Sequence, residues 1–167
     1  GWIGTSFYFI ALDLGLKRRE RMNPGVYGTA WQVHGGGFYH VEKYMVAPSH
    51  LPDDLVWFKW EAYLTWATGF ALLVVQYYLN PRGFLIDPQV AALAPWQAIL
   101  FSLASLGLGW VLYNALCRSR LGQHPALLAG ALFGVLVVAA WIFTHVFSGR
   151  GAFIHIGALI GTMMAFN

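Results

Sequence analysis

The sequence is poor in cysteine and in charge, and both shortages exclude whole classes of protein. Cys117 is the only cysteine, so the chain has neither a disulfide framework nor a Cys-X-X-Cys-His motif for covalent haem attachment. Charged residues make up 10% and hydrophobic residues 58% of the sequence, which lies outside the usual composition of soluble domains. The net charge of +3 does not by itself indicate a nucleic-acid partner, because in a membrane protein the position of each charge matters more than the sum.

Long apolar runs take the place of the missing charge. About 20 apolar residues are needed to cross a bilayer, and complete runs lie at 57–79, 96–117 and 125–147. Partial runs, at 1–16 and 152–167, are cut short by the ends of the sequence. We therefore predict an all-α membrane protein, a polytopic helix bundle with a single transmembrane domain over 1–167, which is a fragment of a longer protein.

Basic residues are concentrated on one side of these predicted spans. They are Lys17, Arg18, Arg19, Arg21, Lys59, Arg118 and Arg120. By the positive-inside rule the loops at 17–56 and 118–124 are predicted to be cytoplasmic, and the loops at 80–95 and 148–151 lie on the outer side. The lipid bilayer is the first expected partner.

The connection at 17–56 is too long for a helix hairpin and too rich in aromatic residues for a disordered linker. Asn23-Pro24-Gly25 marks a turn, and β-branched and aromatic residues then dominate 29–34 and 38–46. We predict a cytoplasmic β-hairpin with Gly35 to Gly37 at its tip, between the first two spans.

Small and polar residues follow helical spacing within the spans. The polar stripe of the span at 57–79 consists of Glu61, Thr65, Thr68 and Gln76. Such a stripe is costly toward lipid, so we expect it to face the bundle interior. Glycine pairs predict close approach of helix backbones. These pairs are Gly130 with Gly134 and Gly157 with Gly161.

Several stretches of the sequence resemble a known family. They read Trp31-Gln32-Val33-His34-Gly35-Gly36-Gly37-Phe38-Tyr39, Trp57-Phe58-Lys59-Trp60-Glu61, Phe84-Leu85-Ile86-Asp87-Pro88 and Thr144-His145-Val146-Phe147-Ser148-Gly149-Arg150-Gly151-Ala152-Phe153-Ile154-His155. In collinear order over nearly the whole chain, they are similar to the membrane domain of bacterial membrane-bound urate hydroxylases, the urate oxidase N-terminal-domain family.

The resemblance implies a multi-pass protein of the bacterial inner membrane, with loops 80–95 and 148–151 periplasmic, that oxidises urate to 5-hydroxyisourate in purine breakdown. In the family a C-terminal cytochrome c domain often follows. Electrons are therefore expected to pass to a c-type cytochrome or to the respiratory chain. A c-type haem is expected only in that missing domain, because this sequence ends before any cytochrome motif.

A site for urate, a flat anion, needs hydrogen-bond donors, an aromatic wall and a base, and the stretch 31–66 supplies such groups. The expected substrate-binding residues are Trp31, Gln32, Gly35, Gly36, Gly37, Lys59 and Trp60. His34, whose ordinary pKa lies near the operating pH, and the intramembrane Glu61 are the expected catalytic residues. Ordinary roles stay open: a glycine turn, an interfacial aromatic belt, a snorkelling Lys59 and a buried ion pair of Glu61.

Two histidines flank the outer turn at 148–151. His145 stands three residues before the turn and His155 four after it, so antiparallel helices bring both to a similar depth. We predict that they ligate the iron of a b-type haem, or another metal, and that Arg150 meets a haem propionate. Hydrogen-bonded histidines at helix ends are the alternative.

Other functions also stay open at this point. One is a non-catalytic or haem-carrying membrane subunit of a larger respiratory or photosynthetic complex. Another keeps the redox chemistry but acts on a different small molecule. An enzyme requires an open polar pocket lined by Gln32, His34 and Glu61, whereas a scaffold fills that space with side chains.

Overall fold

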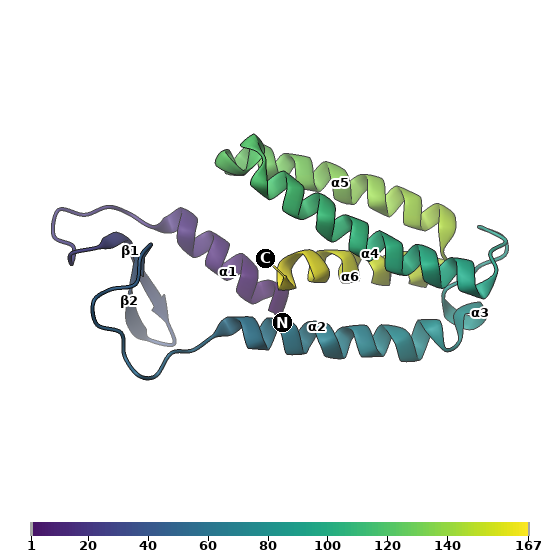
Figure 1. The fold of residues 1–167 in the computed structure, drawn as a ribbon, viewed down its shortest axis with the longest axis horizontal. Coiled ribbons are helices and arrows are strands. Elements are labelled where there is room, and N and C mark those ends of the chain that lie inside the picture. The colour runs from purple at the N-terminus through teal and green to yellow at the C-terminus, as the bar shows by residue number, and fades with distance from the viewer. Residues whose placement is uncertain (1, 167) are drawn as a thin grey trace. The chain divides into compact units, whose positions relative to one another are not determined.

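The computed structural model describes residues 2–166, with side chains from residue 7 onward. The chain divides into two compact units, Gly1–Trp57 and Phe58–Asn167, which we call the hairpin unit and the helical unit (Figure 1). The hairpin unit contains α1 (Trp2–Gly15), β1 (Val26–His34) and β2 (Gly37–Tyr44). The helical unit contains α2 (Phe58–Leu73), a π-helical turn η1 (Val74–Tyr78), α3 (Pro81–Phe84), α4 (Pro95–Arg118), a 3₁₀ turn η2 (Arg120–Gln123), α5 (Pro125–Val146) and α6 (Gly149–Ala165).

Strands β1 and β2 form an antiparallel hairpin, which confirms the predicted hairpin and its glycine tip. His34 pairs with Gly37 across the turn, and Trp31 pairs with His40 further along the ladder. Gly35 and Gly36 have φ of 58° and 79°, and positive φ at both central residues is the signature of a type I′ turn. The glycines are needed because side chains with a Cβ avoid this region.

Helix α1 contacts one face of the hairpin. The Tyr8 hydroxyl donates to Gln32 Oε1, and Lys43 Nζ lies 2.6 Å from Asp13 Oδ2. The segment after α1 then joins the free edge of β1, because Lys17 and Thr29 exchange backbone hydrogen bonds of 2.9 and 3.0 Å. Alternation along the strands turns Trp31, Val33 and Phe38 toward the opposite face, where all three are exposed.

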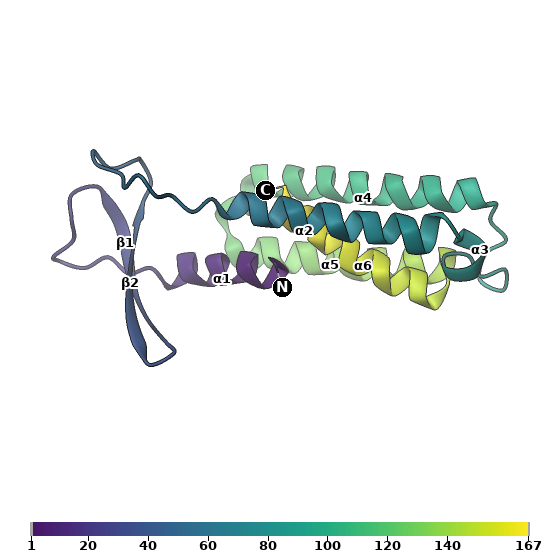
Figure 2. The ribbon, with the colours of Figure 1, turned by 90° about the horizontal axis from the view of Figure 1, so that it is seen from below.

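The long helices of the helical unit pack lengthwise, with α6 in contact with α2, α4 and α5 (Figure 2). Pro81, Pro95 and Pro125 each occupy the first turn of a helix, where proline's missing N–H leaves no hydrogen bond unmade. Ser148 caps α6 by accepting from Gly151 N at 3.1 Å, and its hydroxyl donates to Phe84 O at 2.6 Å. That pair of bonds ties the start of α6 to the end of α3.

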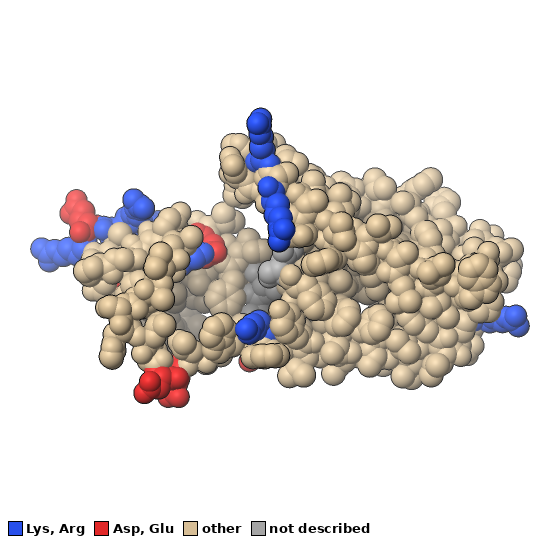
Figure 3. Space-filling model, viewed as in Figure 1, with Lys and Arg blue, Asp and Glu red and all other residues tan. Residues whose placement is uncertain are grey.

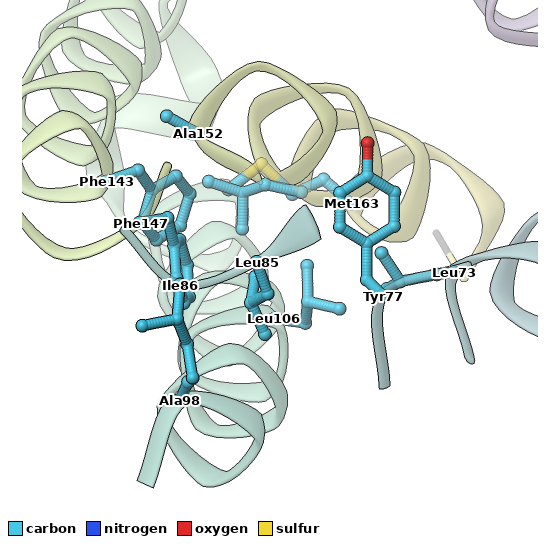
Figure 4. Packing of buried hydrophobic residues seen from close by; sticks show 11 residues of the cluster. Leu73, Tyr77, Leu85, Ile86, Ala98, Leu106, Phe143, Phe147, Ala152 and Met163 are labelled. Carbon is cyan, nitrogen blue, oxygen red and sulfur yellow. The ribbon is translucent and has the colours of Figure 1, made fainter. Parts of the chain in front are cut away.

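The core of the helical unit is apolar and draws on all of its long helices (Figure 4). Its buried members are Leu73, Tyr77, Leu85, Ile86, Ala98, Leu106, Phe143, Phe147, Ala152, Leu159 and Met163. Phe147 is fully buried and packs edge-on against Phe101. Outside this core the visible face of the helical unit is almost free of charge, with lysine and arginine gathered near its ends (Figure 3).

The prediction of an all-α polytopic helix bundle is wrong. The hairpin adds a two-stranded antiparallel sheet, so the fold is α+β. Within residues 2–166, two helices, α4 and α5, are long and apolar enough to cross a membrane. The apolar runs form helices where predicted, but α4 and α5 are the two that qualify as candidate spans among the described residues, not five.

The predicted inward polar stripe of the span at 57–79 is only partly correct. Glu61 and Thr65 are half-buried, but Thr68 and Gln76 are exposed, and Leu73 and Tyr77 are buried instead. Thr68 satisfies its hydroxyl locally, by donating to Leu64 O at 2.9 Å and Thr65 O at 3.0 Å. A hydroxyl that donates to a carbonyl of its own helix needs no polar partner elsewhere. The aromatic and aliphatic side chains therefore decide which face of α2 is buried.

The glycine pairs do not mark close helix contacts as predicted. A Cβ added at Gly130, Gly134, Gly157 or Gly161 would meet nothing within 4 Å. Close approach occurs instead at Gly109 of α4, where an added Cβ would overlap Leu159 of α6. It occurs again at Gly151, where the Cβ would lie 3.1 Å from Phe147 Cβ and 3.2 Å from Leu85 O.

Candidate functional site

The hairpin presents an aromatic stack beside its glycine turn. Trp31 and His40 face each other across the two strands with ring centroids 4.5 Å apart and an interplanar angle of 29°. Trp31 keeps 58% of its surface exposed. His34 is exposed at the last position of β1, directly before Gly35 and Gly36. Backbone pairing therefore gathers Trp31, His34, His40 and the glycines at one end of the hairpin.

Gln32 lies on the other face of the same strand. Its carbonyl oxygen accepts the hydrogen bond from the Tyr8 hydroxyl, which fixes the orientation of the side-chain amide. The amide nitrogen is then the donor end of the side chain. Sequence reasoning did not find Tyr8, because a tyrosine in an apolar helix gives no signal of the strand it will meet.

A second polar cluster lies at the base of the hairpin. Asn23 Nδ2 donates to both carboxylate oxygens of Glu42, at 3.1 and 3.0 Å, and the Tyr44 hydroxyl donates to Glu42 Oε2 at 3.0 Å. The hydrogen bond from Asn23 lowers the pKa of the Glu42 carboxyl most, and the bond from Tyr44 lowers it further. The bond between Tyr44 and Glu42 also raises the pKa of the Tyr44 hydroxyl, because this hydroxyl donates to a carboxylate. This cluster joins the turn at 23–25 to β2 and is structural.

The remaining predicted substrate residues belong to the helical unit, in the first turn of α2. Lys59 Nζ lies 5.4 Å from the centre of the Trp60 ring, a distance at which a cation and a ring attract each other. Trp60 is exposed and Glu61 is half-buried. The predicted site is thus divided, with Trp31, Gln32, His34 and the glycines in one unit and Lys59, Trp60 and Glu61 in the other.

The helical unit contains a buried polar chain that joins η1, α4 and α6. The Tyr78 hydroxyl lies 2.6 Å from Ser102 Oγ, and Ser102 Oγ lies 2.5 Å from His155 Nε2. His155 Nδ1 lies 2.7 Å from Gly151 O. Ser102 and His155 are fully buried, and the His155 ring stacks on Phe147 with centroids 4.4 Å apart.

The predicted histidine pair does not converge on one group. His145 is exposed, and its Nδ1 lies 2.7 Å from Trp141 O. The centroids of the His145 and Trp141 rings are 4.6 Å apart. Both ring nitrogens of His155 have partners, Ser102 and Gly151. An iron ligand must leave one ring nitrogen for the metal, so His155 as arranged here does not fit a haem. The b-type haem therefore stays a prediction from the sequence.

Two further observations bear on cofactors. Arg150, the predicted propionate partner, is exposed and lies 5.5 Å from the centre of the Phe84 ring. No group of three or more His, Cys, Asp or Glu side chains within the described part of the chain is placed to hold a metal ion.

Sequence reasoning assigned no role to Tyr78 or to Ser102. Two neighbouring serines, Ser102 and Ser105, in an otherwise apolar helix were the available signal. Their partner His155 is 53 residues away, so no local spacing could reveal the contact.

Comparison with known proteins gives one match. A family model described as urate oxidase N-terminal matches residues 1–167. No curated protein and no solved structure matches the chain. The match covers both units and every candidate residue described above.

Proposed function

Because the chain belongs to the urate oxidase N-terminal family, we propose that it oxidises urate to 5-hydroxyisourate and passes the electrons to a c-type cytochrome or the respiratory chain. The family match over the whole chain is the observation that carries this proposal. The reaction consumes one urate monoanion and one water, and releases one 5-hydroxyisourate, one proton and two electrons. The protein must therefore bind a flat anion, accept a proton and meet an electron acceptor.

The turn end of the hairpin supports the substrate part of the proposal. Trp31 offers an aromatic surface already stiffened by the stacked His40. The turn glycines offer backbone N–H groups without side chains in the way. The oriented amide of Gln32 lies on the opposite face of the strand from Trp31, so these two side chains do not meet the same face of a bound substrate. His34 beside them is the proposed base. Lys59, Trp60 and Glu61 remain proposed contributors from the helical unit.

We further propose that α4 and α5 enter a membrane. They are 24 and 22 residues long, and only 11% and 6% of their most apolar windows are buried within the chain. The core helix of a soluble protein can be equally long and apolar, but it is then mostly buried by the rest of the chain. Helices α4 and α5 are mostly exposed. Arg118 and Arg120 at the connection between them favour a cytoplasmic position for that end.

Turnover of the purified full chain tests the catalytic proposal. Urate, xanthine and hypoxanthine are supplied in turn, with ferricyanide or a c-type cytochrome as acceptor, and loss of substrate and reduction of acceptor are followed together. We expect turnover of urate, with a loss of about 10- to 100-fold in His34→Ala. His50→Ala is the matched control, because His50 is another exposed histidine of the hairpin unit.

Two outcomes contradict this proposal. Equal losses in the His34 and His50 variants, or none in either, contradict the placement of the base. Absence of turnover with all three purines contradicts the reaction itself and favours the non-catalytic subunit.

The single cysteine offers a direct test of the membrane proposal. Cys117 lies one residue before the end of α4, so a membrane-impermeant maleimide reports which side of a sealed vesicle that end faces. We expect labelling from the cytoplasmic side only. A Cys117→Ser chain with Gln97→Cys, at the other end of α4, should be labelled from the opposite side. Labelling of both positions from one side contradicts a membrane-crossing α4.

A further inference from the structure

The hairpin sorts its side chains onto two faces, and His40 lies on the face that α1 leaves open. Residues paired directly across two antiparallel strands share a face, so Trp31 and His40 lie together, and so do Val33 and Phe38 nearer the turn. Gln32 lies on the opposite face, where it contacts α1. The open face therefore carries an imidazole beside an indole, with apolar side chains between this pair and the turn.

The Trp31 ring alone is a poor partner for an anion. The face of an aromatic ring is electron-rich, so it attracts cations and gives a negative charge no electrostatic attraction. The ring of His40 stacks on Trp31 with centroids 4.5 Å apart, and a protonated imidazole at this distance makes a cation–π contact. The stacked pair then presents a positive charge that the indole lacks.

The ring nitrogens of His40 are available to a ligand. A protonated imidazole has two N–H donors. Within the described residues, neither ring nitrogen of His40 makes a hydrogen bond to the protein. The side chain is exposed, but the stack on Trp31 fixes the plane of its ring. The two donors are therefore held on the open face without a partner of their own.

Glu42 favours the charged form of this imidazole. It lies on the open face, two positions beyond His40 on β2. Hydrogen bonds from Asn23 and Tyr44 lower the pKa of the Glu42 carboxyl, and the charge of His40 lowers it further. Because Asn23 and Tyr44 already bind the carboxylate oxygens, Glu42 attracts the imidazolium without occupying its N–H groups.

Lys17 is the other cation on this face. It pairs with Thr29 in an antiparallel bridge, so its side chain shares the open face, one strand further from His40. A lysine keeps its charge at neutral pH, whereas a histidine changes charge between about pH 5 and 8. Asp13 and Lys43 pair with each other at 2.6 Å on the face that α1 contacts. A pH-dependent affinity for an anion on the open face would therefore report His40.

We propose that His40 is a substrate-binding residue, which holds the urate monoanion on the open face by charge-assisted hydrogen bonds from its protonated ring. This inference rests on the proposed function and adds His40 to the residues that bind the substrate. Trp31 supplies apolar area and keeps the imidazole in place, and the imidazole supplies the charge. A flat purine without charge gains only the apolar part.

Binding of urate to the full chain tests this role without turnover. Equilibrium dialysis under nitrogen, with no electron acceptor, measures the Kd from about pH 6 to about pH 8. We expect the affinity to fall as pH rises, because the imidazole loses its charge. His40→Phe keeps a stacking ring without charge and should weaken binding about 10-fold at the acidic end. His40→Arg supplies a planar, permanently charged group that stacks on indole, so it should restore the affinity and remove the pH dependence.

Two controls separate charge from packing. Hypoxanthine is a flat purine that is uncharged at neutral pH, and its affinity should be the same in the wild-type protein and in His40→Phe. His50→Phe replaces another exposed histidine of the hairpin unit and should leave urate binding unchanged. Equal losses for urate and hypoxanthine in His40→Phe overturn the role of His40. A wild-type affinity for urate that does not change with pH overturns it as well.

Proton NMR of the His40 ring checks the stack itself. The ring protons should be shifted to high field by the indole, and Trp31→Ala should remove that shift. A His40 signal that Trp31→Ala does not move overturns the inference.

The outcomes also distinguish this inference from the proposed function. Absence of urate binding in the wild-type protein overturns both. Urate oxidation whose KM is unchanged by His40→Phe overturns the role of His40 alone. Urate binding with the expected pattern, but with no oxidation when an acceptor is added, supports the His40 site and overturns the proposed reaction.

Discussion

The two units hold similar chemical groups in opposite environments. The hairpin unit exposes Trp31, His34 and His40 at the end of a two-stranded ribbon. The helical unit hides Ser102 and His155 where α4 and α6 meet. A hairpin has two faces, and α1 contacts only one of them, whereas three helices contact α6. Exposed groups can meet a solute directly, but buried groups can act only through the neighbours that hold them.

The same difference governs how each unit should respond to mutation. The hairpin is held by backbone pairing and turn geometry, which local changes can test. The helical unit depends on close packing, in which removal of one ring leaves a void. Comparison of matched substitutions in the two units therefore separates the two sources of stability.

The largest difference is expected between two phenylalanines. Phe147 is 0% exposed and Phe38 is 77% exposed. Phe147→Ala should lower the free energy of unfolding by about 3–5 kcal/mol, because it opens a cavity in the core. Phe38→Ala should change it by less than about 0.5 kcal/mol. Chemical unfolding of both variants measures the difference, and equal losses would show that the hairpin face is buried in the folded protein.

Two glycines of α6 should respond with opposite signs. Gly151→Ala places a Cβ 3.1 Å from Phe147 and 3.2 Å from a backbone oxygen, and such overpacking costs about 1–3 kcal/mol. Gly157→Ala meets nothing within 4 Å and should stabilise the helix by about 0.5–1 kcal/mol. Thermal unfolding of both variants tests this. A loss at Gly157 would reveal a close neighbour of α6.

The hairpin was predictable because its signals are local. The glycine run allows the positive φ of the turn, and the flanking β-branched and aromatic residues favour strands. The sequence likewise located the helices from their apolar runs. It did not show that α2 changes to a π-helical turn at Val74, and that change depends on the packing of Tyr77 and Tyr78.

The candidate site was predictable only in part. Trp31, Gln32 and His34 were grouped from their positions in one stretch, and the structure keeps them on one strand. Their partners Tyr8 and His40 come from other elements. The pairing of Ser102 with His155 needs two helices in contact, and helical spacing within one segment carries no such information. His145 and His155 were predicted to face one group because each lies a few residues from the same turn. In the structure each histidine instead binds partners of its own.

A smaller effect is expected at the hairpin turn. Gly35 and Gly36 both have positive φ, so Gly36→Ala should destabilise the hairpin by about 1–2 kcal/mol. Gly36→Asn should cost less, because asparagine tolerates this region. Gly37→Ala is the control, since its φ is not positive and its Cβ would make ordinary contacts. Amide hydrogen exchange of β1 and β2 measures the change, and a loss confined to Gly37→Ala would contradict a type I′ turn.

The smallest effect should be a pH dependence confined to the hairpin unit. Hydrogen bonds from Asn23 and Tyr44 lower the pKa of Glu42 in the folded state, so their stabilisation is present above the ordinary carboxyl pKa and is lost as pH falls through the lowered one. The raised pKa of Tyr44 gives the opposite sign at alkaline pH, where stability is lost as the hydroxyl ionises.

Asn23→Ala should bring the Glu42 pKa back toward its ordinary value, as carboxyl carbon NMR would measure. Asn80→Ala, which removes the side-chain acceptor for Gly83 N at the start of α3, should leave that titration unchanged. If Asn80→Ala shifts it as well, the two units respond to each other and their stabilities cannot be treated separately.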